Sequence, residues 1–194
     1  MNKKTIFTTV LAVIFALAIF WYIGANPRIA KIGDESTTLR TVQAIDFTVQ
    51  SPYSWTRDFV SIPQLEKDIT VIPQGISDDK PFMVLYPAGE MRKVRILFSV
   101  NDLSSSELSL EKYVQIVEEA MNQYQDFHLI SKKSDLKEYN YEYSYSNAEK
   151  DFLEIKKFYH KDGKLLIVIA TIEASSAPEY VNLTREIIKT ANLR

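Results

Sequence analysis

Cysteine is absent from this 194-residue chain, and glycine occurs only five times, at isolated positions. Without cysteine there is no thiolate nucleophile, no cysteine-bound zinc and no disulfide scaffold. Without clustered glycines there is no phosphate-binding loop and no G-x-S-x-G nucleophile elbow. Positive charge is not in excess either, since 23 Lys+Arg face 25 Asp+Glu and give a net charge of −2. Because phosphate contacts dominate nucleic-acid affinity, we expect no nucleic-acid partner.

Histidine is almost as scarce, with only His128 and His160. A general base needs an aligned partner in a pocket, and a zinc site needs three or four ligands. Neither histidine has a second one nearby in the sequence, so we predict no catalytic, cofactor-binding or metal-ligating residue, no cofactor and no enzyme. The alternative is an exported hydrolase or metal-dependent enzyme whose acids are brought together only by the fold.

A long apolar run over residues 6–23 is the first strong feature that the sequence does contain. As a helix, these residues would span about 27 Å, close to the about 30 Å of a bilayer's hydrocarbon core. Trp21 and Tyr22 fall at its far end, where aromatic rings favour the headgroup region. We therefore predict a membrane anchor over residues 1–25, with Lys3 and Lys4 in the cytoplasm and the rest of the chain outside.

Cleavage of this segment as a signal peptide, which would secrete the protein, is the alternative. A cut after Ala25 would place Ile23 at a position where a small residue is preferred, so we favour the uncleaved single-pass anchor. Residues 26–41 hold Pro, Gly, Asp, Ser and Thr without a sustained period and are interpreted as a linker. An extracytoplasmic domain is then predicted over residues 42–194.

The core of that domain is predicted at residues 164–172, an unbroken apolar run rich in β-branched residues. A strand needs such a run only when both of its faces are covered. Apolar side chains at helical spacing predict one helix over residues 110–124, with Ser109 as its N-cap. A second helix is predicted over residues 176–191, where Ser176 and Glu179 have the spacing of a capping box.

Further strands are predicted where apolar side chains alternate, or where short apolar runs are bounded by Pro and Gly. They cover residues 42–50, 69–72, 82–86, 94–100, 126–132, 138–146 and 151–160, with residues 57–67 irregular and a hairpin at Asp162 and Gly163. The predicted fold class is α+β, a mainly antiparallel sheet covered by two helices in an α/β/α sandwich, preceded by one transmembrane helix.

Four tyrosines alternate with other residues over 138–146; they are Tyr139, Tyr141, Tyr143 and Tyr145. A period of two places the four rings on one face of a sheet. One interpretation is a core position beneath a helix. The other is a partner surface at the ends of the row, since tyrosine is enriched at interfaces and four rings are more than one helix readily covers.

Four lysines gather around the predicted hairpin that follows; they are Lys156, Lys157, Lys161 and Lys164. One interpretation is a solvated edge strand that lysine protects from unwanted pairing. The other is a basic patch that faces anionic lipid head groups, because the domain is tethered close to a bilayer.

Several segments also carry a resemblance to a known family. They are Phe47-Thr-Val-Gln-Ser-Pro-Tyr-Ser-Trp55, similar to an F-x-x-x-x-P-x-x-W entry, Leu110-Glu-Lys-Tyr113, Phe127-His-Leu-Ile-Ser131, and the Asp162-Gly163 hairpin before residues 165–171. With the order of elements, they resemble the PsbP-like domain family, including its bacterial DcrB-type relatives, over about residues 42–193. The resemblance implies an α/β/α sandwich and a mostly noncatalytic group, and no metal or binding residue is transferred from it.

The expected function is that of a membrane-anchored, noncatalytic binding or assembly module for another envelope or membrane protein. A carrier of a small apolar ligand, bound between the sheet and a helix, is a further alternative.

Overall fold

The computed structural model describes residues 38–60, 82–104, 109–147 and 150–194. The predicted anchor, most of the predicted linker and the predicted strand at 69–72 lie outside these residues. The contacts described below belong to the compact unit Arg40–Arg194. Among the described residues, no helix has both the length and the apolar character needed to cross a membrane.

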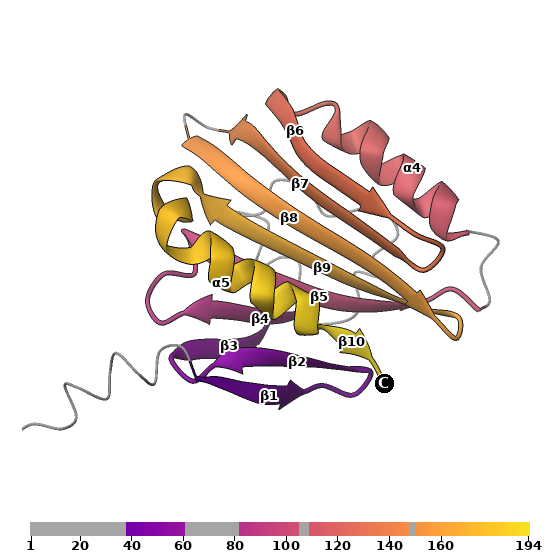
Figure 1. Cartoon of the computed structure of the whole chain (residues 1–194), viewed down its shortest axis with the longest axis horizontal. Coiled ribbons are helices and arrows are strands. Elements are labelled where there is room, and N and C mark those ends of the chain that lie inside the picture. The colour runs from indigo at the N-terminus through magenta and orange to yellow at the C-terminus, as the bar shows by residue number, and fades with distance from the viewer. Residues whose placement is uncertain (1–37, 61–81, 105–108, 148–149) are drawn as a thin grey trace, which may run out of the picture. The chain divides into compact units, whose positions relative to one another are not determined.

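A seven-stranded antiparallel sheet forms the centre of the domain (Figure 1). Its strands lie in the order β3-β4-β5-β9-β8-β7-β6. Their bounds are β3 (Trp55–Val60), β4 (Phe82–Pro87), β5 (Val94–Asp102), β6 (Gln125–Ser134), β7 (Glu138–Asn147), β8 (Lys150–Lys161) and β9 (Lys164–Glu173). The middle position of β9 confirms the central strand predicted at residues 164–172.

A second, three-stranded sheet holds β1 (Leu39–Gln43), β2 (Phe47–Pro52) and β10 (Asn192–Leu193), in the order β1-β2-β10. The single strand predicted over residues 42–50 is wrong, because the chain turns between β1 and β2. The Ala44 N–H donates to the Phe47 carbonyl at 2.9 Å, and Ile45 is 92% exposed at this turn. The irregular stretch predicted from Arg57 is also wrong as far as Val60, where β3 ends.

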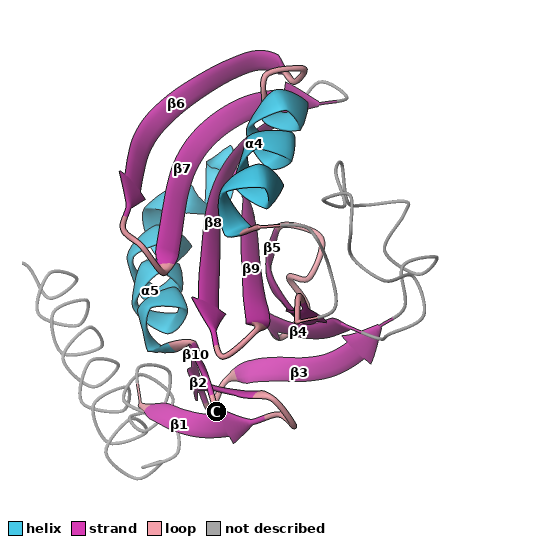
Figure 2. Ribbon diagram, turned by 90° about the vertical axis from the view of Figure 1, so that its right-hand side faces the viewer, coloured by secondary structure: helices cyan, strands magenta, loops and turns pink. Residues whose placement is uncertain are grey.

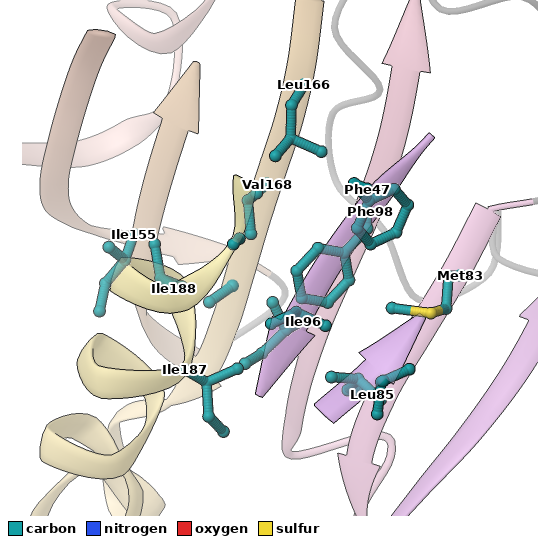
Figure 3. Packing of buried hydrophobic residues seen from close by; sticks show 14 of the residues in the cluster. Phe47, Met83, Leu85, Ile96, Phe98, Ile155, Leu166, Val168, Ile187 and Ile188 are labelled. Atoms are coloured by element: carbon teal, nitrogen blue, oxygen red, sulfur yellow. The ribbon is translucent and has the colours of Figure 1, made fainter. Parts of the chain in front are cut away.

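Both faces of the large sheet are covered, as the apolar run in β9 predicts. Leu166 and Val168 belong to one core, which α5 (Ala177–Thr190) covers with Ile187 and Ile188. Figure 3 shows part of this core. The alternate residues Leu165, Ile167 and Ile169 belong to a second core, which α4 (Leu110–Met121) covers. Figure 2 shows the two helices on opposite sides of β8 and β9, which confirms the predicted sheet with two helices.

The two helix starts differ in their capping. Ser109 is extended (φ −72°, ψ 160°), and its hydroxyl accepts a hydrogen bond from the Lys112 N–H at 3.2 Å, which confirms the predicted N-cap. Ser176 makes no side-chain capping bond, so the predicted capping box is wrong. A 3₁₀ turn, Ala174–Ser176, leads directly into α5 and gives Ser176 a helical backbone instead of the extended one that a cap needs.

Ser109→Ala is therefore expected to lower the free energy of unfolding by about 1 kcal/mol, because it leaves a helix N–H without its partner. Ser176→Ala is the matched control, and its expected effect is at most roughly a few tenths of a kcal/mol. Urea unfolding of the full chain in detergent micelles measures both. Equal losses from the two substitutions would contradict the capping difference.

Candidate functional site

The tyrosine row of β7 lies beneath α4. Tyr141, Tyr143 and Tyr145 are buried, with at most 2% of their surface exposed, and Tyr139 is half-buried. The Tyr141 hydroxyl donates to Glu118 of α4 at 2.5 Å. These positions favour the core interpretation, because three of the four rings are not available to a partner. Only Tyr139 retains partly exposed surface for the predicted partner contact.

A buried ion pair, which no sequence pattern indicated, lies among these tyrosines. Lys156 Nζ lies 3.1 Å from Glu154 Oε1, and neither side chain is more than 6% exposed. The carboxylate also accepts hydrogen bonds from the Tyr143 hydroxyl at 2.5 Å and the Tyr145 hydroxyl at 3.1 Å. Burial, together with the charge of Glu154, raises the pKa of Tyr143 and keeps its hydroxyl neutral. The network joins β7 to β8 inside the core.

The four lysines of the predicted basic patch do not share one surface, although Lys161 and Lys164 lie opposite each other at the β8–β9 hairpin. Lys156 and Lys157 are neighbours in β8, so their side chains point to opposite faces of the sheet, and both are buried. Lys161 and Lys164 are half-buried. The lipid-facing patch is therefore wrong for Lys156 and Lys157. The edge-strand interpretation is also wrong, because β8 lies between β7 and β9.

The two histidines are separated in the sheet. His128 is exposed on β6, His160 is half-buried on β8, and β7 lies between these strands. Within the described residues, no three His, Asp or Glu side chains are grouped so that they could hold a metal ion. A candidate binding site is instead provided by a groove on the surface of the domain.

An open groove of about 680 Å³ lies where the small sheet meets the β3 end of the large sheet. This volume is within the about 300–1,000 Å³ of typical ligand sites. Its lining comes from the β1–β2 turn, from β3, β4 and β5, and from the residue after β10. The lining residues are Gln43, Ala44, Ile45, Asp46, Phe47, Arg57, Phe59, Met83, Phe98, Ser99, Val100 and Arg194. We take this groove as the candidate functional site.

The floor of the groove is aromatic and its walls are apolar. Phe47 of β2 and Phe98 of β5 stack with ring centroids 5.4 Å apart and an interplanar angle of 13°. Met83 of β4 also belongs to the floor, and all three side chains are buried (Figure 3). Ile45 and Phe59 are 92% and 58% exposed. Large apolar side chains so exposed at a concave site are typical of an interaction surface.

The charged groups of the groove give it a positive character. Among the described residues, its lining holds Arg57, Arg194 and one acid, Asp46. Asp46 contacts Lys164 at 2.6 Å, and this hydrogen bond raises the pKa of Lys164. In the described part of the chain, neither Arg57 nor Arg194 forms a salt bridge. The Arg57 guanidinium carbon lies 6.0 Å from the centre of the Phe59 ring.

A smaller polar hollow of about 490 Å³ adjoins the groove and shares Gln43 and Arg57 with it. Its remaining described lining residues are Arg40, Thr41, Val42 and Thr56. As far as the structure describes the chain, this lining holds two guanidinium groups and no carboxylate. Arg40 donates from Nη2 to the Trp55 carbonyl at 3.3 Å. Its Nε is buried and has no hydrogen-bond partner among the described residues. The positive character therefore continues from the groove into the hollow.

None of the groove residues was predicted as a site. They come from segments far apart in the sequence, and no local pattern around any of them indicates a site. Among the segments that carry the family resemblance, Phe47 to Trp55 contains a residue of the groove lining, but the resemblance implies no binding role for it.

Comparison with solved structures assigns the fold. The chain is similar to cyanobacterial PsbP (CyanoP) from Synechocystis, with a TM-score of 0.51 and 14% identity, over 81% of this chain and 93% of that one. It is also similar to LpqN, involved in cell envelope biogenesis of Mycobacterium tuberculosis (0.49, 12% identity, 80% and 90% covered). A protein of unknown function from Pseudomonas aeruginosa is a third such structure (0.42, 12%, 78% and 94%).

No protein-family model matches the sequence, and no curated protein matches it. The likeness to cyanobacterial PsbP confirms the PsbP-like fold that the resemblance implied. At 14% identity it concerns the fold alone.

Proposed function

We propose that this chain is a noncatalytic binding module, anchored in the cell membrane by residues 1–25 with its domain outside the cytoplasm. It binds another envelope or membrane protein through the groove between the two sheets. The observation that carries this proposal is the make-up of the groove, with its aromatic floor, apolar walls and guanidinium groups. Aromatic side chains and arginine are the residue types enriched where proteins bind one another.

The chemistry of the groove favours binding over catalysis. Among the described residues of its lining there is no histidine, and its one carboxylate, Asp46, is in contact with Lys164. General acid–base catalysis needs a titratable group within reach of a substrate proton. The PsbP-like fold supports the same conclusion, because the resemblance implies a mostly noncatalytic group.

The predicted anchor adds an advantage in local concentration. The 13 residues 26–38, between the anchor and the first described strand, reach at most about 45 Å when fully extended. A domain tethered this closely meets membrane proteins at a high effective concentration. A modest intrinsic affinity in the groove is therefore sufficient for the proposed role.

Photo-crosslinking of the full chain in its native membranes tests this function. A photoreactive amino acid at Ile45 or Phe59, on the groove walls, is expected to give the same discrete crosslinked product. The control position is Leu136, which is 92% exposed between β6 and β7 at the other end of the sheet. It is expected to give no such product, because it lies far from the groove along the strand order.

Two results would contradict the proposed function. One is crosslinking from Leu136 equal to that from the groove positions. The other is recovery of the intact chain in the cytosol after cell fractionation, since a cytosolic protein has no access to partners outside the membrane.

A further inference from the structure

We propose that the groove binds an extended peptide segment of its partner in which one large apolar side chain is flanked by carboxylates. This inference rests on the proposed function and specifies the chemistry of the partner segment. It follows from three properties of the groove, which are its apolar walls, its charge and its openness.

The apolar walls select a large apolar side chain. Ile45 and Phe59, on the groove walls, are the side chains that offer apolar surface to a partner. The floor residues Phe47, Phe98 and Met83 are buried and fixed in the core, so they hold this surface in place. A side chain that enters from the partner therefore meets a preformed surface, which reduces the entropy lost on binding. Thioether and aromatic groups both contact aromatic rings favourably.

The charge of the lining selects carboxylates on either side of that anchor. Arg57 lies between the groove and the polar hollow, Arg40 lines the hollow, and Arg194 lines the groove. The one acid that the structure describes in the two linings, Asp46, is already in contact with Lys164. Guanidinium groups match carboxylates in geometry and bind them with charge-assisted hydrogen bonds. A segment with acids before and after its apolar anchor complements this arrangement.

The openness of the groove favours a peptide over a free amphiphile such as a fatty acid. Small-molecule sites enclose about 70–90% of their ligand. Here the wall residues Ile45 and Phe59 are themselves largely exposed, so an acyl chain in the groove would keep much of its surface in water. A peptide segment carried by a folded partner covers these side chains as well.

Selection from random displayed peptides of about 12 residues, a length suited to groove recognition, tests the inference on the full chain in lipid nanodiscs. The enriched peptides are expected to share an aromatic or large aliphatic residue with acids on both sides. For one synthetic peptide from the set, Arg57→Glu and Ile45→Asp are each expected to weaken binding by about tenfold or more. Both residues are exposed, so neither substitution removes core packing.

Lys133→Glu is the matched control, because it makes the same charge change at an exposed position on β6, the opposite edge strand. It is expected to weaken the same peptide less than about twofold, since charges this far apart are screened. Circular dichroism of every variant checks that the fold is retained.

The outcomes separate the inference from the proposed function. One outcome is that the enriched peptides lack acids, bind more weakly to Ile45→Asp and bind Arg57→Glu normally. This result would support the groove as a binding site but would contradict the acidic flanks of the segment. Peptides insensitive to both substitutions would overturn the groove as the binding surface. If no peptide is enriched while oleate binds and loses affinity with Arg57→Glu, the occupant is an amphiphile and the peptide inference is wrong.

Discussion

Glu154→Gln is expected to lower the free energy of unfolding by about 3–5 kcal/mol, because it leaves the Lys156 ammonium buried without its counter-charge. The Lys156 side chain is 1% exposed, so water cannot replace the lost partner. For a domain of this size, such a loss lowers Tm by about 6–20 °C, at about 2–4 °C per kcal/mol. Thermal unfolding of the full chain in detergent, followed by near-ultraviolet circular dichroism of the buried tyrosines, measures it.

Two further variants make this result specific. Glu173→Gln removes the partner of Lys150 in an exposed pair, whose lysine side chain is 58% exposed. It is expected to change stability far less, because water and salt screen such pairs. Lys156→Met combined with Glu154→Gln removes both charges and is expected to regain much of the loss. A Glu154→Gln effect no larger than that of Glu173→Gln would show that the buried pair is not energetically coupled.

The layered architecture could be predicted because the pattern of apolar residues records which faces are covered. An uninterrupted run in β9 has no polar side, and its consecutive residues Leu165 and Leu166 indeed enter different cores. The stripe on α4 and its Ser109 cap are equally local signals. Each depends on residues close in sequence, so reasoning from the sequence captures it.

The β1–β2 turn was missed because nothing in its local sequence interrupts the alternation. Ala44, Ile45 and Asp46 include neither Gly nor Pro, and Ile45 continues the apolar period into Phe47. The chain reverses there because both strands find partners in the small sheet, including β10 from the far end of the chain. That pairing is a tertiary effect with no local signature.

The buried ion pair and the groove were missed for a related reason. The charged residues Glu154 and Lys156 stand two apart on one face of β8, which by itself predicts a solvent-exposed face. In the fold both faces of β8 are covered, so these side chains lie in a core. The groove combines the β1–β2 turn with three strands of the other sheet and Arg194. The groove forms only where the two sheets pack together, and the sequence contains no local signal for where they pack.

Trp55→Ala is expected to lower the free energy of unfolding by about 3–5 kcal/mol, because it opens a cavity where the small sheet joins the large one. Trp55 is the first residue of β3 after the turn from β2, and it is 3% exposed. Its ring meets Tyr180 of α5 edge to face, with centroids 6.3 Å apart. The indole therefore packs the start of β3 against α5, within the core that also contains Val42 and Phe47 of the small sheet. Urea unfolding of the full chain measures the loss.

Tyr53→Ala is the matched control, since Tyr53 is an aromatic residue in the same turn but is 57% exposed. Its expected effect is below about 1 kcal/mol, as for most exposed positions.

Because the groove lies at the junction that Trp55 stabilises, Trp55→Ala is also expected to weaken peptide binding under conditions in which circular dichroism still reports a folded sheet. If Trp55→Ala loses stability but keeps full peptide affinity, the groove does not depend on this junction. If Trp55→Ala lowers the free energy of unfolding no more than Tyr53→Ala does, the indole does not stabilise the packing of β3 against α5.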